Sequence, residues 1–467
     1  MNTKHGSHFK LVYSDWYDVD GNRIPIGNGM PPVIVEFIRR LQENNTNVDY
    51  SEILQHEQKR KPIKFDHTEL KNYFSRCYPN NIVSSNDIKD DNFIYIYPLE
   101  IKDTLEALSN ENVFRLEGKD YTWMLKDILP QELLTHFRSG KVKILINVIH
   151  DPNYDDTNIR AFELQMAELG IDGSNIILVS GSKFDEYYQR HPTSKVKIYS
   201  GHLFLQQGSL IMHQFPQMGP LGYWSEFVEE ADISDSVLRP YKFLCFNRTM
   251  HKPHRAGMAY LAVKHDLLTE GKFSFIQKLS KNTLQNYINQ VVLDPDQEHI
   301  RTIEEMLPYE LDTQHLSESK KSGFAVSNNK KELYIDTYIH IVTETFFGNN
   351  VFLSEKIFRP ISNFQPFIVL GDYGSLVELK RLGFKTFEPF IDESYDLETD
   401  PRKRFEMIEN EIIKLKNKSI NEIHNWYHSI KDILVHNRNH LYHYYNGYEC
   451  FESICEQIKI TYENERI

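Results

Sequence analysis

Short apolar runs alternate with amphipathic stretches between residues 93 and 181. FIYIYPLE at 93–100 predicts a strand, and DTLEALSN at 103–110 predicts a short helix. KVKILINVIHD at 141–151 predicts a buried strand that ends in polar residues. NIRAFELQMAELG at 158–170 then predicts a helix, and NIILVSG at 175–181 predicts another strand. The order is strand–helix–strand.

The same alternation restarts after residue 240. The second half predicts three apolar strands, at 241–247, 338–345 and 366–371, and helices at 254–265 and 375–383. SEKIFRPI at 354–361 is a candidate start of a further helix. The polar stretch that leads to about residue 333 is interpreted as helical. From about 401 onward, Glu, Lys and Ile recur at helical spacing, which predicts long closing helices.

This alternation predicts an α/β fold with parallel sheets, in which ligands lie beyond the carboxyl ends of the strands. A break rich in Pro, Gly and acids at 214–240 predicts the linker between two α/β halves. We therefore expect an N-terminal lobe at 1–235, irregular over 1–90, a second lobe at 241–400 and closing helices at 401–467.

Composition narrows the class of protein. The chain has 467 residues, 40% of them hydrophobic and 13% aromatic, so it can bury a sizeable core. Its net charge of −13 disfavours bulk DNA, RNA or anionic lipid as a partner, although a local pocket for a small anion needs only a few donors.

Cysteines and the N-terminus bear on the compartment. The four cysteines have no metal-ligand spacing and are interpreted as reduced thiols: Cys77, Cys245, Cys450 and Cys455. No apolar signal-peptide core follows the first residues, and no window approaches the 18 or so apolar residues of a membrane span. We expect a cytoplasmic protein.

The first cluster of candidate residues is FNRTMHKPHR, between a strand and a helix. Arg248, His251, Lys252, His254 and Arg255 fall close together there. Cations at a helix N-terminus oppose its dipole unless an anion lies among them, so one interpretation is a phosphate-binding site. The alternative is a solvated basic loop without a ligand.

The second cluster follows the strand that ends in VTET. Glu344, Glu355, Lys356 and Arg359 are separated there by apolar and aromatic residues. A carboxylate at such a strand end can accept both hydroxyls of a ribose, while Lys356 and Arg359 can meet a diphosphate. The alternative is an ion pair between Glu355 and Arg359 on one helix face.

The third candidate is IHDPNYDD, which follows the buried strand at 141–151. His150 and Asp151 begin a loop where a ligand is expected, and either side chain can act as a general base. The alternative is a turn, because Asp-Pro-Asn commonly opens one. The acids at 391–396 favour a capping or loop role over a metal site, and the His- and Tyr-rich 436–448 favours a packed helix end.

The second half resembles the donor-binding lobe of inverting glycosyltransferases of the GT-B architecture, and within them the α1,3-fucosyltransferase family. Arg255 matches the Arg of that family's helix start, and Phe352, Glu355 and Lys356 match its aromatic–x–x–Glu–Lys motif. The stretch from VTET to DESYD is also similar to poorly characterised phage and large-virus proteins.

The resemblance implies two Rossmann-like lobes and a role for each matching residue. Arg255 and Lys356 would bind the donor diphosphate, and Glu355 would bind the nucleotide ribose. Phe352 would pack on the nucleotide without the hydroxyl of the usual Tyr. The catalytic base would come from the N-terminal lobe, where position alone suggests His150 and Asp151.

We therefore expect a glycosyltransferase that moves a sugar from a nucleotide-diphosphate sugar to a hydroxyl of a glycan or glycoconjugate. Inversion, no metal and no separate cofactor are expected, with a GDP-linked sugar as one candidate donor and the host cytoplasm as the compartment if the protein is viral. Two alternatives stay open. One is a transferase acting on hydroxymethylated bases of viral DNA, and the other is a catalytically silent binding or scaffold protein of the same fold.

Overall fold

The computed structural model describes the chain in segments. They are residues 10–13, 16–17, 23–24, 82–84, 93–96, 112–116, 119–123, 129, 133–148, 156–180, 187–200, 228–233, 237–309, 311 and 331–446. The chain divides into two compact units, one of Met1–Leu203 with Cys450–Ile467 and one of Phe204–Glu449. We call them unit 1 and unit 2. The lobe boundaries expected from the sequence stay a prediction.

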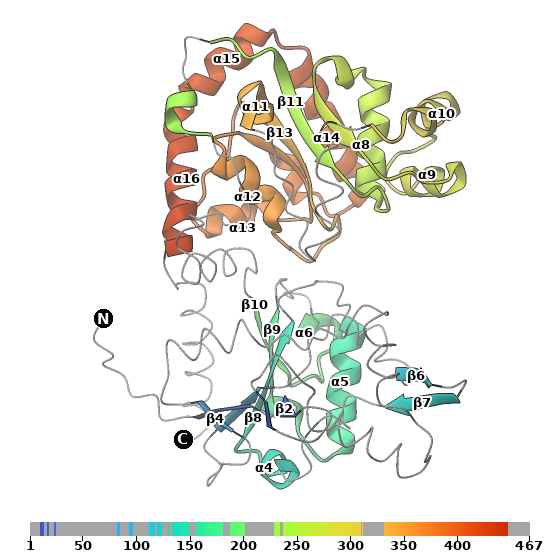
Figure 1. The fold of residues 1–467 in the computed structure, drawn as a ribbon, viewed down its shortest axis with the longest axis vertical. Coiled ribbons are helices and arrows are strands. Elements are labelled where there is room, and N and C mark those ends of the chain that lie inside the picture. The colour runs from blue at the N-terminus through green and yellow to red at the C-terminus, as the bar shows by residue number, and fades with distance from the viewer. Residues whose placement is uncertain are drawn as a thin grey trace. The chain divides into compact units, whose positions relative to one another are not determined.

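Unit 1 contains a parallel sheet of six strands in the order β10-β9-β8-β5-β1-β4 (Figure 1). These strands are β1 (Lys10–Tyr13), β4 (Ile82–Ser84), β5 (Phe93–Ile96), β8 (Lys143–Val148), β9 (Ile176–Ser180) and β10 (Lys197–Ser200). Helix α5 (Asp156–Glu168) connects β8 to β9. The predicted strand–helix–strand order is thus confirmed, and the helix expected at 103–110 lies outside the described residues.

Unit 2 contains a parallel sheet in the order β12-β11-β13-β14. Its strands are β11 (Tyr241–Asn247), β12 (Gly271–Phe275), β13 (Thr337–Thr343) and β14 (Phe367–Leu370). The chain goes outward from β11 to β12, then returns across β11 to β13 and continues to β14. The direction of winding therefore reverses between β11 and β13, which is where parallel α/β sheets hold their ligands.

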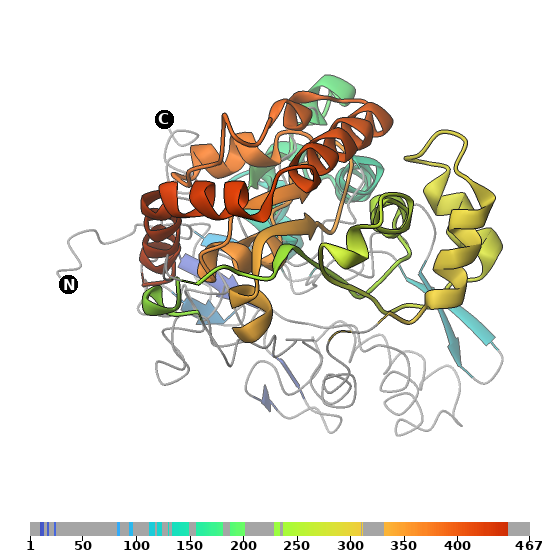
Figure 2. The same ribbon diagram turned by 90° about the horizontal axis from the view of Figure 1, so that it is seen from above.

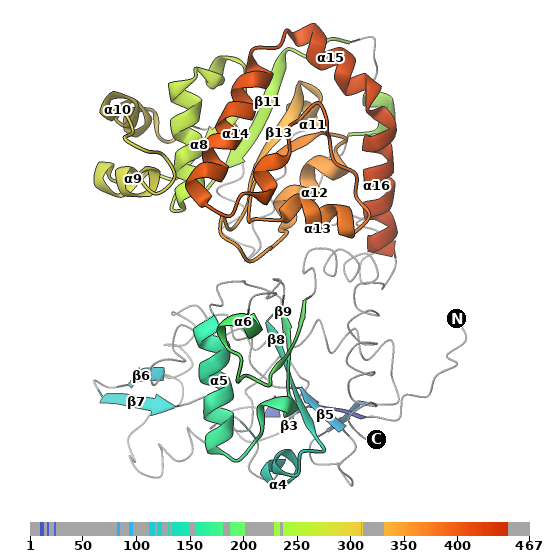
Figure 3. The ribbon, with the colours of Figure 1, turned by 180° about the vertical axis from the view of Figure 1, so that it is seen from behind.

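Helices cover both faces of the unit 2 sheet. The helices described in unit 2 are α8 (Pro253–Lys264), α9 (Lys281–Ile288), α10 (Gln297–Met306), α11 (Lys331–Ile335), α12 (Glu355–Ser362), α13 (Ser375–Arg381), α14 (Pro401–Lys416), α15 (Ile420–Ser429) and α16 (Lys431–Asn446). The opposite views in Figures 1 and 3 show α12 on one side of the sheet and α8 with α14 on the other. Figure 2 shows α9 and α10 together beside α8. The predicted closing helices are confirmed as far as Asn446.

A buried central strand and one glycine underlie the position of α8 in unit 2. Every residue of β13 is buried, which fits its mostly apolar sequence, since a central parallel strand is covered on both faces. A Cβ at Gly257 of α8 would come within 2.6 Å of the Phe405 ring in α14. Only glycine allows this close packing, and it fixes the position of α8, whose first turn reaches the carboxyl end of β11.

The helical interpretation of the stretch leading to residue 333 is wrong at β12. GKFSF is too short to show a clear period, yet Phe273 and Phe275 are fully buried and the strand pairs with β11. A Cβ at Gly271 would lie 2.6 Å from the Phe243 carbonyl oxygen, so the first residue of the strand must be glycine. Strand β10 in unit 1 also escaped the sequence analysis, because KIYS has no long apolar run.

Candidate functional site

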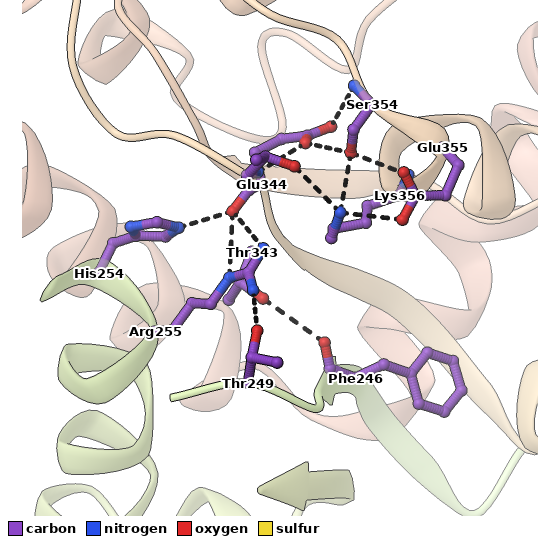
Figure 4. Close-up of polar contacts among 10 residues, drawn as sticks. Phe246, Thr249, His254, Arg255, Thr343, Glu344, Ser354, Glu355 and Lys356 are labelled. Atoms are coloured by element: carbon purple, nitrogen blue, oxygen red, sulfur yellow. Dashed lines mark hydrogen bonds and ion pairs between the residues drawn. The ribbon is translucent and has the colours of Figure 1, made fainter. Parts of the chain in front are cut away.

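The first two clusters of candidate residues meet at the carboxyl ends of β11 and β13. β11 ends at Asn247 and leads through Thr249 to α8, while β13 ends at Thr343 and leads through Glu344 to α12 (Figure 4). The Thr343 hydroxyl and the Phe246 carbonyl oxygen are 3.5 Å apart across the two strands. The sequence separates these clusters by about a hundred residues, and the strand order brings them together.

The main chain of Glu344 connects the two strand ends. Its N–H donates to the Leu370 carbonyl of β14 at 2.9 Å. Its carbonyl oxygen accepts from His254 Nε2 at 2.7 Å and from Arg255 Nε and Nη2 at 3.2 and 2.9 Å. The first turn of α8 is therefore fastened to the residue that follows β13, and charge-assisted hydrogen bonds from a guanidinium are among the stronger contacts of this kind.

The side chain of Glu344 organises the start of α12. The carboxylate is fully buried and accepts from the backbone N–H of Thr345 at 2.9 Å and of Ser354 at 3.2 Å. The Ser354 hydroxyl donates to the same carboxylate and accepts from Lys356 N–H at 3.2 Å, so Ser354 caps α12. Burial raises the pKa of Glu344 despite the nearby Lys356 cation. The Glu344 carboxyl group thus holds Thr345 and Ser354, and with them the start of α12, in position.

Glu355 and Lys356 form the more accessible part of the site. They pair at 2.9 Å, with side chains 31% and 26% exposed. Lys356 Nζ also donates to Thr345 Oγ1 at 3.1 Å and to Ser354 Oγ at 3.2 Å. Burial acts to raise the pKa of Glu355, but the positive charges of Lys356 and Arg359 outweigh it and hold the pKa at about 2. Glu355 is therefore an ionised acceptor at neutral pH.

The alternative interpretation, an ion pair between Glu355 and Arg359, differs from the structure, in which Glu355 pairs with Lys356. Arg359 still acts on Glu355 as a nearby charge. Its Nε is buried and has no hydrogen-bond partner among the residues that the structure describes. A buried donor of this kind is costly unless a ligand or water meets it.

The basic cluster at α8 carries less charge than its sequence suggests. Burial lowers the pKa of His254 well below its ordinary value, and the neighbouring Arg255 lowers it further, so His254 is neutral. It contributes a hydrogen-bond donor to Glu344 and a ring that stacks on Phe347 at 5.3 Å. Arg255, also buried, completes its contacts by donating from Nη1 to Thr249 Oγ1. These bonds explain how the helix start tolerates a cation.

The remaining predicted residues surround this centre at different depths. Arg248 is exposed directly after β11, and Lys252 Nζ lies 4.9 Å from the centre of the Phe346 ring. His251 Nδ1 lies 3.0 Å from Gln277 Oε1. Phe352 is buried and packs edge-on against Phe346 at 6.0 Å, so its ring serves the packing of the loop in this structure.

The other candidate residues of the sequence analysis are His150 with Asp151 and the acids at 391–396. His150 and Asp151 lie outside the described residues. The acids at 391–396 take the predicted capping and loop roles, since Asp396 accepts from Leu376 and Val377 N–H and Glu393 accepts from Phe387 N–H. Within the described segments, no group of three or more His, Cys, Asp or Glu could hold a metal ion. Over the same residues, each helix is too short or too polar to cross a bilayer.

The cysteine and helix-end interpretations are tested in part. Cys245 is a free, buried thiol in β11. At the end of α16, His440 and Tyr444 pack on Phe384, with ring centres 4.9 and 6.0 Å apart, which confirms the packed helix end as far as it is described. The other three cysteines lie outside the described residues.

Sequence reasoning missed the hydroxyl groups of the site. Thr249, Thr345 and Ser354 each accept from or donate to a charged side chain. Ser and Thr are common in every loop, so their presence alone carries little information. Ser354 had one usable signal, because it opens the candidate helix SEKIFRPI and serine is a preferred N-cap.

Comparisons with known proteins add little to this geometry. No family model and no curated protein sequence matches the chain. Among solved structures, it is similar to an alpha,alpha-trehalose-phosphate synthase (UDP-forming) from Burkholderia vietnamiensis, with 11% identity, a TM-score of 0.34 and 96% of this chain and 99% of that chain covered. An alpha,alpha-trehalose 6-phosphate synthase from Burkholderia multivorans has 8% identity, a TM-score of 0.35 and 98% of each chain covered. At such TM-scores, neither likeness bears on the function of this chain.

Proposed function

We propose that the chain is a glycosyltransferase that binds a nucleotide-diphosphate sugar at the carboxyl ends of β11 and β13 and transfers the sugar to an acceptor hydroxyl. One observation carries the proposal: Glu344 joins the two clusters, with its carbonyl on His254 and Arg255 and its carboxylate on Ser354. A charged site is thereby assembled where the winding of the sheet reverses, the usual ligand position in such sheets.

The cations of this site suit a diphosphate. Lys356 stands at the N-terminus of α12, where the helix dipole also favours negative charge. Arg359 offers a buried Nε without a partner among the described residues, and Arg248 is exposed after β11. Arg255 already uses its guanidinium on Glu344 and Thr249, so it supports a phosphate through its charge and through the frame it holds.

The acid of the site suits a ribose. Glu355 is partly exposed, and its pKa of about 2 keeps it ionised at neutral pH. An ionised carboxylate accepts two hydroxyl hydrogen bonds without itself needing a donor. The resemblance to the fucosyltransferase motif supports the same assignment for Glu355, and it makes a GDP-linked sugar one candidate donor.

The chemistry proposed for the transfer is a direct displacement. A base from the N-terminal lobe, with His150 and Asp151 as the candidates, removes the proton from the acceptor hydroxyl. The acceptor oxygen attacks the anomeric carbon, and the bond to the diphosphate oxygen breaks with its electron pair on the diphosphate. Lys356, Arg359 and Arg255 stabilise that charge, so we propose inversion without a metal requirement.

A ligand panel tests the donor site. We expect one of GDP, UDP, CMP and dTDP to raise the melting temperature selectively, because a ligand at about 100 times its Kd stabilises the folded state by about 2.7 kcal/mol. The matching nucleotide sugar should then be hydrolysed slowly or transferred to an added glycan. A melting temperature unmoved by every nucleotide would contradict the donor site, and binding without hydrolysis or transfer would point to a silent relative of the same fold.

Salt-dependent retention on DNA separates a glycan acceptor from a nucleic-acid acceptor. The net charge of −13 leads us to expect no retention at about 0.15 M salt. Strong retention that falls steeply with salt would instead favour a transferase acting on modified DNA bases.

A further inference from the structure

The 346–350 segment, between β13 and α12, is held by residues that follow β14 and by one residue of α14. Asp372, which follows β14, accepts from Gly348 N–H through Oδ1 at 2.5 Å. Arg404 of α14 donates from Nη2 to the carbonyl oxygens of Phe347 and Gly348 at 3.1 and 2.9 Å. The N–H of Tyr373 donates to the same Gly348 carbonyl at 2.9 Å. The side chains of Asp372 and Arg404 thus fix the main chain of this segment.

The same segment touches the donor site with its two phenyl rings. The Phe347 ring stacks on His254 with an angle of 18° between the planes, and Arg404 Cζ lies 4.6 Å from the centre of that ring. The Phe346 ring lies beneath Lys252 Nζ. A displacement of the segment would therefore move the contacts of the first turn of α8.

Asp372 is an unusual anchor because one of its two buried carboxyl oxygens lacks a hydrogen-bond partner among the described residues. The residue is 2% exposed, and Oδ2 has no hydrogen-bond partner among the described residues. Burial raises the pKa of Asp372 to about 7, and the Glu344 carboxylate contributes in the same direction. The N–H groups of Gly348 and Phe352 and the charge of Arg404 act against this rise without cancelling it.

We propose that Asp372 is a positioning residue for the donor site, which holds the 346–350 segment in place while its carboxyl is protonated and loosens it on ionisation. The effect on donor binding rests on the function proposed above. The hold on the segment itself rests only on the contacts of Asp372 with Gly348 and on the burial of its carboxyl group.

The direction of the effect follows from where the proton binds more tightly. An opened segment exposes the carboxyl to water, where its pKa returns toward the ordinary 3.8, whereas in the closed state it is about 7. The closed state therefore binds the proton more tightly, and closure is favoured at low pH. It weakens as the pH rises from about 4 to about 7 and changes little above that range.

Amide hydrogen exchange of the 346–353 segment tests the hold without any nucleotide. After correction for the intrinsic rate, we expect protection to fall by about tenfold or more from pH ~5 to pH ~8 in the unaltered chain. Asp372→Asn keeps a neutral side chain of the same shape and should show no such fall. Asp392→Asn, which alters an exposed acid of the same unit, is the matched control and should behave like the unaltered chain.

Two further measurements complete the test: protection of a reference helix and nucleotide affinity as a function of pH. Protection of residues 420–429 in α15 serves as an internal reference, so the unaltered chain alone tests the proposal if Asp372→Asn does not fold. Affinity for the nucleotide that the panel identifies should weaken over the same pH range in the unaltered chain and stay flat in Asp372→Asn.

Protection that is independent of pH in the 346–353 segment overturns the proposal, as does an equal fall in Asp372→Asn. If protection falls as expected but no nucleotide binds, the hold by Asp372 stands and the donor assignment of the proposed function fails. If a nucleotide binds with the same pH dependence in both proteins, the connection between Asp372 and the donor site is contradicted.

Discussion

The first four strands of each parallel sheet are arranged in the same order in the two units, but different residues follow the equivalent strands. In each sheet the first strand in chain order lies between the second and the third, β1 between β4 and β5 in unit 1 and β11 between β12 and β13 in unit 2. Arg248 and Thr249 follow β11, whereas Ser14 and Asp15 follow β1 in the sequence. A shared topology thus provides two similar places for ligands, and the residues after the strands decide their chemistry.

The difference favours a division of labour between the units. The strand ends of unit 2 carry cations and an ionised acid, which suit a diphosphate and a ribose. The candidate bases His150 and Asp151 follow β8, which pairs with β5, one of the two strands at the reversal in unit 1. We expect changes in unit 1 to act on turnover and changes in unit 2 to act on donor binding.

Loss of the base is the largest effect expected from a single change. Asp151→Asn or His150→Ala should lower kcat by about 10²- to 10⁴-fold, the range for removal of a general base, and leave nucleotide affinity unchanged. Steady-state kinetics beside calorimetry measures both quantities. Normal turnover in both variants would exclude this loop as the source of the base and would leave the division between the units without support.

The loss of stability on removing a buried glutamate is expected to differ between the two units. Glu344→Ala in unit 2 leaves the N–H groups of Thr345 and Ser354 without their acceptor and should lower the free energy of unfolding by about 3 kcal/mol. Glu163→Ala in unit 1 removes contacts with Lys195 N–H and the partly exposed Arg160, so about 1 kcal/mol is expected. Denaturant titration of both variants measures the difference, and equal losses would contradict the central position of Glu344.

Removal of divalent metal should have the smallest effect of all. If Lys356, Arg359 and Arg255 neutralise the leaving diphosphate, turnover after treatment with EDTA should equal that of the untreated enzyme. An activity assay before and after chelation, with Mn²⁺ and Mg²⁺ added back, measures it. Lost turnover that either ion restores would show that side chains alone do not supply the positive charge.

The sequence predicted those parts of the fold whose pattern is long and regular. The strands β8, β11 and β13 are mostly apolar and do not alternate strictly between polar and apolar residues, since a strand covered on both faces needs no polar side. β12 was missed because its packing depends on Gly271 fitting against Phe243, a tertiary contact without a local signal. Strand order was not readable either, so the loop after β8 could not be distinguished from those at the reversal of winding.

The sequence singled out the charged residues that meet at the candidate site, but it did not show which of them are buried and which are accessible. Glu344 and Glu355 are both acids near one strand end, but only the structure shows the first fully buried and the second partly exposed. His254 read as a cation, and burial makes it neutral. Such differences depend on burial and on partners distant in the chain, which a local pattern does not contain.

Calorimetric titration of one nucleotide into three proteins tests the central claim most directly. With the nucleotide that gives the largest thermal shift, Lys356→Ala should bind about 10- to 150-fold more weakly than the unaltered chain, because a charge-assisted contact to phosphate contributes about 1.5–3 kcal/mol. Lys385→Ala, which alters an exposed lysine of the same unit, should bind like the unaltered chain. Equal affinity in all three proteins would contradict a donor site at the ends of β11 and β13.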